Sequence, residues 1–432
     1  MANPIVIAGG TVVDQLSERR VDLLLRNGVI ADSGEPGTFD GLGETVDASD
    51  AIVMPGLVDI QVHFRTPGGE ESEDIYSGAA GAALGGVTAC VMMPNTIPTI
   101  DNVEIVSDVL SLARTAVCDV RTSAAITVDR AGERLVDFAA LHHAGVRVFT
   151  DDGWVVDEAD LMEAALRQTL GLPGAVISQH AEHSEMVAGG VINAGSVAER
   201  LGLPGRPREA EAVIVERDIA LAAKTGGRYH VLHMSTSLAT EQVRRAKHSG
   251  LRVTAEVTPQ HLILTEDDVE RLGAAGKMNP PLRLTEDVAA LRTALLDGTI
   301  DAVATDHAPH HPDLKEMGLA DAPPGMLGVE TMASVVWDTF VNGGLMTSQQ
   351  FVAVTSSQPA RIASIGEHGQ PLTPGNPANI AVFDPAKTWS IDGSSLQSKS
   401  TNTPWQGQRF TGQVRHTICR GQLVVHEGVL TN

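Results

Sequence analysis

The chain has 432 residues, of which 43% are hydrophobic and 20% charged, a balance typical of globular proteins and unlike that of disordered chains. The net charge of −23 argues against nucleic acid or an anionic membrane as a partner, because both bind positively charged surfaces. An anionic substrate must therefore meet cations placed close to its binding site. The length exceeds what one hydrophobic core usually fills, so we expect one large domain and a smaller one.

The two ends of the chain are predicted to be rich in β-strands. Short apolar segments between turn residues lie at residues 5–14, 21–25, 28–30, 379–383, 416–419 and 422–425, and a turn is predicted at 18–20. No helix of useful length is expected before Pro55. We therefore predict a small β-sandwich domain built from both termini, residues 1–54 and 367–432.

Between these ends, apolar runs alternate with amphipathic helical patterns. Eight apolar runs end in polar residues, at 57–63, 87–95, 120–126, 146–152, 175–180, 229–233, 252–258 and 302–306. Helical patterns cover 102–114, 159–170, 208–224, 237–248 and 286–296. This alternation predicts an α/β fold with a parallel sheet, and eight repeats within residues 55–366 favour a (β/α)8 TIM barrel. A doubly wound open sheet is the alternative, but no Gly-x-Gly-x-x-Gly follows the first strand.

The cysteines and the N-terminal sequence favour a cytoplasmic location. Cys90, Cys118 and Cys419 form no Cys-x-x-Cys pair, and their odd number is typical of free thiols in a reducing compartment. The first residues lack the basic and apolar segments of a signal peptide. The longest apolar stretch, residues 79–93, contains three glycines and is too short to span a bilayer.

Potential metal ligands stand where five of the predicted strands end: His63, Asp151 and Asp152, His180, His233, and Asp306. In a (β/α)8 barrel these ends converge on the face that carries the active site. Each residue alone has an ordinary explanation, such as a hydrogen-bonded histidine or an aspartate that caps a helix. Together, three imidazoles and at least two carboxylates form the ligand set of Zn²⁺ or a related divalent ion. The joint pattern therefore predicts a metal site.

Residues 55–68, Pro-Gly-Leu-Val-Asp-Ile-Gln-Val-His-Phe-Arg-Thr-Pro-Gly, are similar to the first-strand signature of type I dihydroorotases in the amidohydrolase superfamily, Asp-x-His-x-His-x-Arg-x-Pro-Gly. The resemblance continues in order at residues 93–96, 149–153, 230–236, 256–259, 277–283, 304–310 and 402–404. It implies the zinc-dependent, reversible cyclisation of N-carbamoyl-L-aspartate to L-dihydroorotate in pyrimidine (UMP) biosynthesis. It also implies either a homodimer or a complex with aspartate transcarbamoylase.

The resemblance assigns roles to individual residues. The implied metal ligands are His63, Asp152, His180, His233 and Asp306. Asp152 would bridge two zinc ions, with Asp151 as the alternative, and Asp306 would also be the general acid/base. The implied substrate-binding residues are Arg65, Asn95, Asn279 and His310, with backbone contacts near Pro324 and Gly325.

Three of these residues have competing interpretations. Arg65 suits a planar carboxylate, because a guanidinium can donate two parallel hydrogen bonds to it. The alternative for Arg65 is an ion pair with the acidic residues at 70, 71, 73 or 74, and for Asn95 a turn after Pro94. His307 and His311, on either side of His310, are interpreted as loop residues.

The chain departs from the family pattern at Gln61, which replaces the first histidine of the His-x-His pair. An amide is a poorer zinc ligand than an imidazole, so we expect one or two zinc ions, with the first site weakened. Gln260 also replaces a histidine, and no Phe stands between Pro324 and Gly325. Two alternatives follow: a related cyclic amidase such as an allantoinase or hydantoinase, and a non-catalytic scaffold for aspartate transcarbamoylase.

Each alternative has an argument against it. Allantoinases and hydantoinases usually carry a lysine on the fourth strand, and residues 145–149 contain none. A non-catalytic relative would be expected to lose several site residues. This chain keeps Asp306, Arg65, Asn95 and His310, which favours an enzyme.

Overall fold

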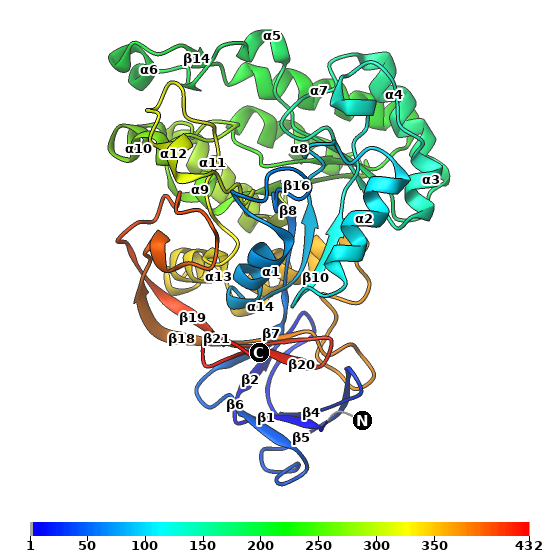
Figure 1. The fold of residues 1–432 in the computed structure, drawn as a ribbon, viewed down its shortest axis with the longest axis vertical. Coiled ribbons are helices and arrows are strands. Elements are labelled where there is room, and N and C mark those ends of the chain that lie inside the picture. Colours follow the sequence, from blue (N-terminus) through cyan, green and yellow to red (C-terminus); the bar gives the residue numbers. More distant parts are fainter. Residues whose placement is uncertain (1–2, 432) are drawn as a thin grey trace.

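The computed structural model describes residues 3–431, and segments from both termini form two β-sheets at one end of the molecule (Figure 1). The four-stranded sheet has the order β5 (Val29–Gly34), β4 (Asp22–Arg26), β1 (Ile5–Ala8) and β6 (Glu44–Asp47). The seven-stranded sheet has the order β21 (Val429–Leu430), β20 (Gln422–His426), β19 (Arg409–Cys419), β18 (Ile380–Ser390), β7 (Ile52–Pro55), β2 (Thr11–Val13) and β3 (Glu18–Arg20). Strand β7 pairs with β18, so the two ends of the chain share one sheet.

The predicted turn at residues 18–20 is wrong. These residues form β3, which pairs antiparallel with β2, and the turn lies just before them. There the Asp14 carboxylate accepts hydrogen bonds from the backbone nitrogens of Leu16 (2.9 Å) and Ser17 (3.1 Å). Charged side chains suit this position because β3 is an edge strand, where they oppose pairing with another chain.

The middle of the chain contains eight parallel strands. Three of them form one sheet: β8 (Leu57–Val62), β9 (Val87–Met92) and β10 (Asp119–Thr122). Five form another: β11 (Val148–Phe149), β12 (Val176–Gln179), β15 (Tyr229–Val231), β16 (Val253–Val257) and β17 (Ala302–Val303). Isolated parallel bridges, Ala124 with Phe149 and Val62 with His307, join the two sheets along both edges. The carboxyl ends of all eight strands therefore lie on the same side.

Helices between the strands cover their outer faces (Figure 1). The longer ones are α1 (Ile75–Leu84), α2 (Val103–Ala113), α4 (Ala159–Gln168), α7 (Glu209–Thr225), α8 (Ser237–His248) and α11 (Thr285–Leu296). The shorter ones are α3 (Phe138–His143), α5 (Ser184–Val187), α6 (Ser196–Leu201), α9 (Pro259–Ile263), α10 (Glu266–Leu272), α12 (Pro312–Lys315), α13 (Met332–Val336), α14 (Ser348–Val352) and α15 (Gln358–Ile362). A short parallel pair, β13 (Ile192–Asn193) and β14 (Gly205–Arg206), lies between α5 and α7.

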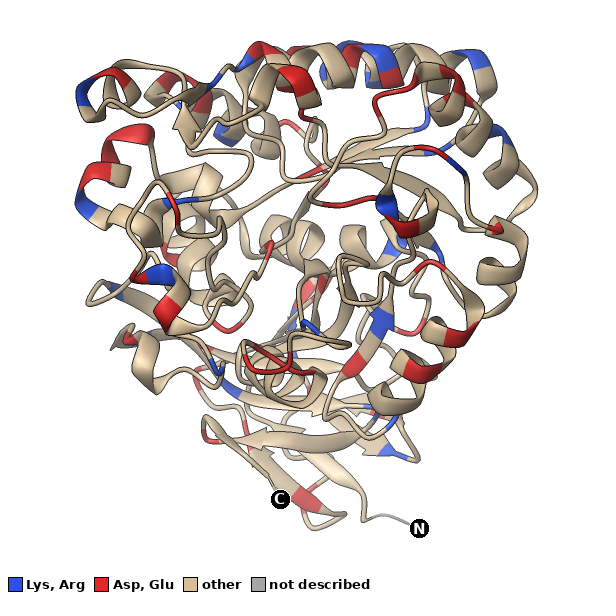
Figure 2. Cartoon of the chain, turned by 45° about the horizontal axis from the view of Figure 1, so that its top comes forward, with Lys and Arg blue, Asp and Glu red and all other residues tan. Residues whose placement is uncertain are grey.

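Helix α8 illustrates why the amphipathic sequence pattern predicts a helix correctly. The Thr236 hydroxyl accepts a hydrogen bond from the Ala239 backbone nitrogen and caps the first turn, while Ala239, Val243 and Ala246 are buried along one face. Acidic residues are distributed along the outer helices (Figure 2). Across residues 3–431, none of the helices combines the length and apolar character needed to cross a membrane.

Candidate metal centre and active site

The predicted site residues line one open cavity of about 220 Å³. The five proposed metal ligands lie at or just beyond strand ends: His63 directly follows β8 and His180 directly follows β12, whereas Asp152, His233 and Asp306 come two or three residues after β11, β15 and β17. Because parallel strands end on the same side, these side chains meet although they are far apart in sequence. The lining consists of His63, Arg65, Asn95, Asp152, Gly153, His180, His233, Asn279, Asp306, Ala308, His310, Pro324 and Gly325.

Asp152, His180 and His233, which we call the inner group, are buried and point at one another. His180 Nδ1 lies 2.9 Å from His233 Nε2, and Asp152 Oδ1 lies 3.8 Å and 3.6 Å from these two nitrogens. Burial acts to raise the pKa of Asp152, but hydrogen bonds with His180 and His233 outweigh it and hold the pKa well below its usual range. Two imidazole nitrogens facing each other beside a carboxylate form a donor set that fits a divalent cation.

Glu182 orients His180, and the sequence analysis missed this role. His180 Nε2 donates to Glu182 Oε2 at 3.2 Å, which leaves Nδ1 free to face the inner group. Burial would raise the pKa of Glu182, but His180, Arg206 and Arg283 outweigh it and hold the pKa at about 2. The one available signal was its position two residues after a candidate ligand.

His63, Asp306 and the shared Asp152 form a second set, which we call the outer group. His63 Nδ1 donates to Asn95 Oδ1 at 2.9 Å, so Nε2 is left to face Asp306 Oδ1 at 2.9 Å and Asp152 Oδ2 at 3.4 Å. Asn95 also donates from Nδ2 to Asp152 Oδ2 at 3.4 Å. Asn95 is therefore more than a turn residue, because its amide holds two members of the outer group.

Gln61 lies beside Asp152, the residue that the two groups share, and turns its side-chain nitrogen toward that carboxylate. Nε2 donates to Asp152 Oδ1 at 3.2 Å, while the buried Oε1 has no hydrogen-bond partner within residues 3–431. In this orientation Gln61 supplies a donor, not a ligand, to Asp152. Within the same residues, only the inner group presents three metal-binding atoms that all lie within 4.8 Å of one another.

The two adjacent aspartates have different surroundings. Asp151 accepts hydrogen bonds from the backbone nitrogens of Ile126 (2.7 Å) and Thr127 (3.0 Å) and from the Thr127 hydroxyl. Its carboxylate is thus occupied by the segment that follows β10. Asp152 faces the cavity, and Arg130 holds its backbone oxygen at 2.7 Å.

Arg65 and His310 line the other side of the cavity. Arg65 Nε donates to Pro309 O at 3.1 Å, and the guanidinium forms no ion pair within 4.0 Å with acidic side chains of residues 3–431. Burial lowers the pKa of Arg65 to about 10, while Asp306 and Asp152 act to raise it, so the group stays protonated at neutral pH. Burial lowers the pKa of His310 to about 3, so this imidazole is neutral and its Nε2 donates to Pro324 O at 2.8 Å. Arg65 therefore supplies the positive charge on this side of the cavity.

Three of these residues have left-handed backbone conformations that side chains rarely adopt: Arg65 (φ 50°), His233 (φ 30°) and Asp306 (φ 47°). Such conformations cost about 1–3 kcal/mol each and persist where the surrounding structure enforces them. All three follow a strand, so the turn directs each side chain into the cavity. This concentration of strained backbone agrees with a functional role for the cavity.

Imidazoles and carboxylates grouped at the ends of parallel strands, beside a buried arginine, define a metal-binding hydrolase of the amidohydrolase type. Solved structures agree on the fold. The L-hydantoinase (dihydropyrimidinase) from Arthrobacter aurescens superposes with a TM-score of 0.90 at 25% identity, covering 100% of this chain and 98% of that one. A dihydropyrimidinase from Brevibacillus agri gives 0.86 at 23% identity, covering 99% and 96%.

Comparison with known sequences specifies the family. The dihydro-orotase-like family model matches residues 50–239. The dihydroorotase of Mycobacterium leprae is 42% identical over 407 residues, 94% of each chain, and that of Streptomyces coelicolor is 41% identical over 413 residues, 95% of this chain and 96% of its own. The dihydroorotase of Leifsonia xyli is 42% identical over 429 residues, 98% and 97%. The chain belongs to the dihydroorotase family, as the sequence motifs predicted.

Proposed function

We propose that this protein is a dihydroorotase, which interconverts N-carbamoyl-L-aspartate and L-dihydroorotate. The observation that carries the proposal is the single cavity in which a carboxylate–imidazole cluster faces a protonated arginine. A cyclic amide that bears a carboxylate needs both features: groups that activate water and a carbonyl, and a cation that holds the anion. Because the net charge of −23 repels an anionic substrate, binding of that substrate depends on this local cation.

We infer that residues 55–366 form a (β/α)8 barrel and that residues 1–54 and 367–432 form a β-sandwich. The bridges between the two parallel sheets support closure of the barrel. A separate hydrophobic core, which includes Ile7, Leu23, Val53, Ile380 and Ile418, supports the sandwich because its members come from both terminal sheets.

The inner group would hold one Zn²⁺, and the outer group a second ion that shares Asp152. Imidazole and carboxylate ligands suit zinc, although other divalent ions accept the same ligands. When bound, the metal lowers the pKa of a water and polarises the amide carbonyl. Arg130 and Asn95 fix the position of Asp152, and Glu182 fixes the ring of His180.

Asp306 would transfer the proton. Its carboxylate borders the cavity and lies 2.9 Å from His63 Nε2. During ring opening it would take a proton from the attacking water and give it to the amide nitrogen as the carbon–nitrogen bond breaks. During cyclisation it would take the proton from that nitrogen as the carbon–nitrogen bond forms and pass it to the hydroxide that leaves as water. His63 orients Asp306, and the Asn95 amide orients His63 in turn.

Arg65 would bind the substrate carboxylate, with Asn279, His310 and the backbone of Pro324 and Gly325 around the ring. The Arg65→Ala variant should raise KM for dihydroorotate about 10- to 100-fold, because a hydrogen-bonded ion pair is worth about 1.5–3 kcal/mol. Hydrolysis of neutral dihydrouracil should change little. An equal loss toward both substrates would exclude Arg65 as the anion-binding residue.

The direct test is metal analysis of the purified protein together with a dihydroorotate hydrolysis assay at several added concentrations of Zn²⁺, Mn²⁺ and Co²⁺. The proposal predicts bound metal and turnover. A second candidate, a non-catalytic scaffold for aspartate transcarbamoylase, is favoured by the Gln61 amide beside Asp152. Bound metal without turnover at any ion concentration would exclude the enzyme, and a complex with aspartate transcarbamoylase would then establish the scaffold. Mass measurement with and without an aspartate transcarbamoylase would distinguish the homodimer from the mixed complex.

A further inference from the structure

A segment near the C-terminus, residues 397–402, which we call the strap, crosses three loops at the rim of the proposed active site. It precedes β19 and belongs to none of the barrel repeats. The loops are the segment between β8 and α1, the His310 loop (residues 307–311) and the Gly325 loop (residues 323–329).

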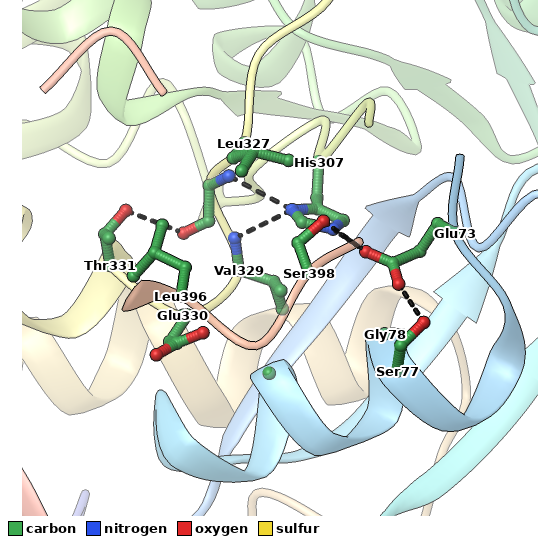
Figure 3. Close-up of a pocket in the computed structure, with 12 residues that line it drawn as sticks. Glu73, Ser77, Gly78, His307, Leu327, Val329, Glu330, Thr331, Leu396 and Ser398 are labelled. Carbon is green, nitrogen blue, oxygen red and sulfur yellow. Dashed lines mark hydrogen bonds and ion pairs between the residues drawn. The ribbon is translucent and has the colours of Figure 1, made fainter. Parts of the chain in front are cut away.

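One end of the strap reaches a buried carboxylate (Figure 3). Ser398 Oγ donates to Glu73 Oε2 at 2.5 Å, and Glu73 is fully buried. The same Oε2 lies 3.5 Å from Nε2 of His307, whose Nδ1 accepts a hydrogen bond from Gly328 N at 3.1 Å. His307 was interpreted as a loop residue, but its ring links the Gly325 loop to Glu73.

The middle of the strap contacts the segment between β8 and α1. Lys399 Nζ lies 2.6 Å from the Asp74 carboxylate and 2.7 Å from Glu70 O, and Ser400 Oγ donates to Ser72 O at 2.8 Å. This segment also carries Arg65. The strap is thus connected to the loop of the proposed anion-binding residue.

The other end, Asn402, lies between the His310 loop and the Gly325 loop. Its Nδ2 donates to Ala308 O and to Gly325 O, both at 3.0 Å. Its Oδ1 accepts from His310 N at 3.4 Å. One buried carboxamide therefore satisfies three backbone groups of the two loops that carry His310, Pro324 and Gly325, half of the proposed substrate-binding residues.

The two loops approach each other closely where Asn402 joins them. Gly325 has φ 144°, and a Cβ at this position would lie 2.8 Å from His310 Nε2 and 2.7 Å from the Ala308 Cβ. Only a carboxamide can donate two hydrogen bonds and accept a third from this position. An aspartate would place acceptor oxygens against two carbonyls, and an alanine would leave all three backbone groups without this partner. One backbone bond, from Ala308 N to Met326 O at 2.8 Å, would still join the loops.

We propose that Asn402 is a positioning residue that fixes the gap between the His310 loop and the Gly325 loop, and thereby sets substrate affinity. The proposal rests on the proposed function. Asn402 contacts none of the implied metal ligands, so its loss acts on the substrate side of the cavity and leaves both ligand groups in place. Because Asn402 acts on the substrate side alone, its loss should change KM and leave kcat and bound metal unchanged.

The test compares the Asn402→Ala, Asn402→Asp and Asn342→Ala variants of the full chain. Asn342 is exposed, and within residues 3–431 its side chain hydrogen-bonds only to Asp338 and Thr411, so it is a matched control for the same truncation. We expect Asn402→Ala to raise KM for dihydroorotate about tenfold, the equivalent of one or two lost hydrogen bonds, with kcat and bound metal unchanged. Asn402→Asp should be at least as impaired. A fall in kcat with unchanged KM, or an effect equal to that of the control, would overturn the proposal.

Hydrogen exchange provides a measurement that does not depend on activity. In the wild type, the backbone amides of His310 and Leu327, which donate to Asn402 Oδ1 and Asn402 O, should exchange slowly. In Asn402→Ala the amide of His310 should exchange faster, while β8 and β12 should not change. Fast exchange at His310 in the wild type would overturn the strap proposal even if no variant folds. A wild type with slow exchange but no dihydroorotase activity would instead contradict the proposed function alone.

Discussion

The inner and outer ligand groups share Asp152 but hold their imidazoles differently. In the inner group, His180 is oriented by a buried carboxylate, Glu182, and its free nitrogen faces that of His233 at 2.9 Å. In the outer group, His63 is oriented by a neutral amide, Asn95, and Gln61, which stands in place of a histidine, donates to the shared Asp152. A carboxylate partner makes an imidazole more basic than an amide partner does. The comparison therefore predicts one strong metal position and one weak position.

The change with the largest expected effect removes the residue that both groups share. Asp152→Asn should lose bound metal from both positions and reduce turnover below detection, because the amide lacks the charge that pairs with a divalent ion. Metal content of the purified variant is the measurement. Asp151→Asn is the matched control. It should keep its metal and lose stability instead, because Asp151 is held by Ile126 and Thr127. Metal loss in the control and not in Asp152→Asn would reverse the two assignments.

A substitution confined to the outer group should have the second-largest effect on turnover. Asp306→Asn should lower kcat by about 10²- to 10⁴-fold, the usual contribution of a positioned acid/base. The inner group should still bind its ion, since Asp306 contacts His63 and no member of the histidine pair. Turnover above about a hundredth of the wild-type rate would rule out proton transfer by this residue.

The Glu182→Gln variant tests whether the carboxylate that orients His180 strengthens metal binding by the inner group. Loss of a carboxylate behind a metal-binding histidine typically lowers metal affinity about 10- to 100-fold. We expect that decrease in a competition titration with a chelator, with little change in KM. Asn95→Ala, the corresponding change behind His63, should weaken the outer ion more than the inner one, because it removes the partner of His63 but only one of the contacts that hold the shared Asp152. Equal losses of metal affinity in the two variants would contradict the predicted difference between the inner and outer groups.

Gln61→His should change turnover the least of these variants. It should bring the metal affinity of the outer group closer to that of the inner group. We expect the wild type to purify with nearer one ion than two and to gain activity when Zn²⁺, Mn²⁺ or Co²⁺ is added, because Gln61 donates to Asp152 and supplies no ligand. The variant should hold more metal and depend less on added ion. Gln260→His is the control, because Gln260 does not line the cavity. Two tightly bound ions in the wild type would contradict the weak-site prediction.

Strand and helix positions were largely readable from local patterns. The five predicted helices each overlap an observed one, and all eight predicted strands overlap an observed parallel strand. The observed strands are shorter, as at residues 148–149, because pairing stops where the chain turns toward the cavity. Strands β18 and β19 are longer than predicted, because their outer halves pair through isolated aromatic residues, Trp389 with Phe410, flanked by polar ones, and so form no continuous apolar run.

The sequence by itself determined the family, the alternation of strands and helices, and the candidate ligands, because strand-end residues of a repeated α/β pattern are recognisable from local order alone. Tertiary structure decided which aspartate faces the cavity, which nitrogen of each histidine is free, and which atom of Gln61 faces Asp152. These outcomes depend on partners far away in the chain, such as Thr127 for Asp151 and Asn402 for His310. Hydrogen-bond geometry across such separations leaves no periodic trace in a single sequence, so only the folded chain reveals it.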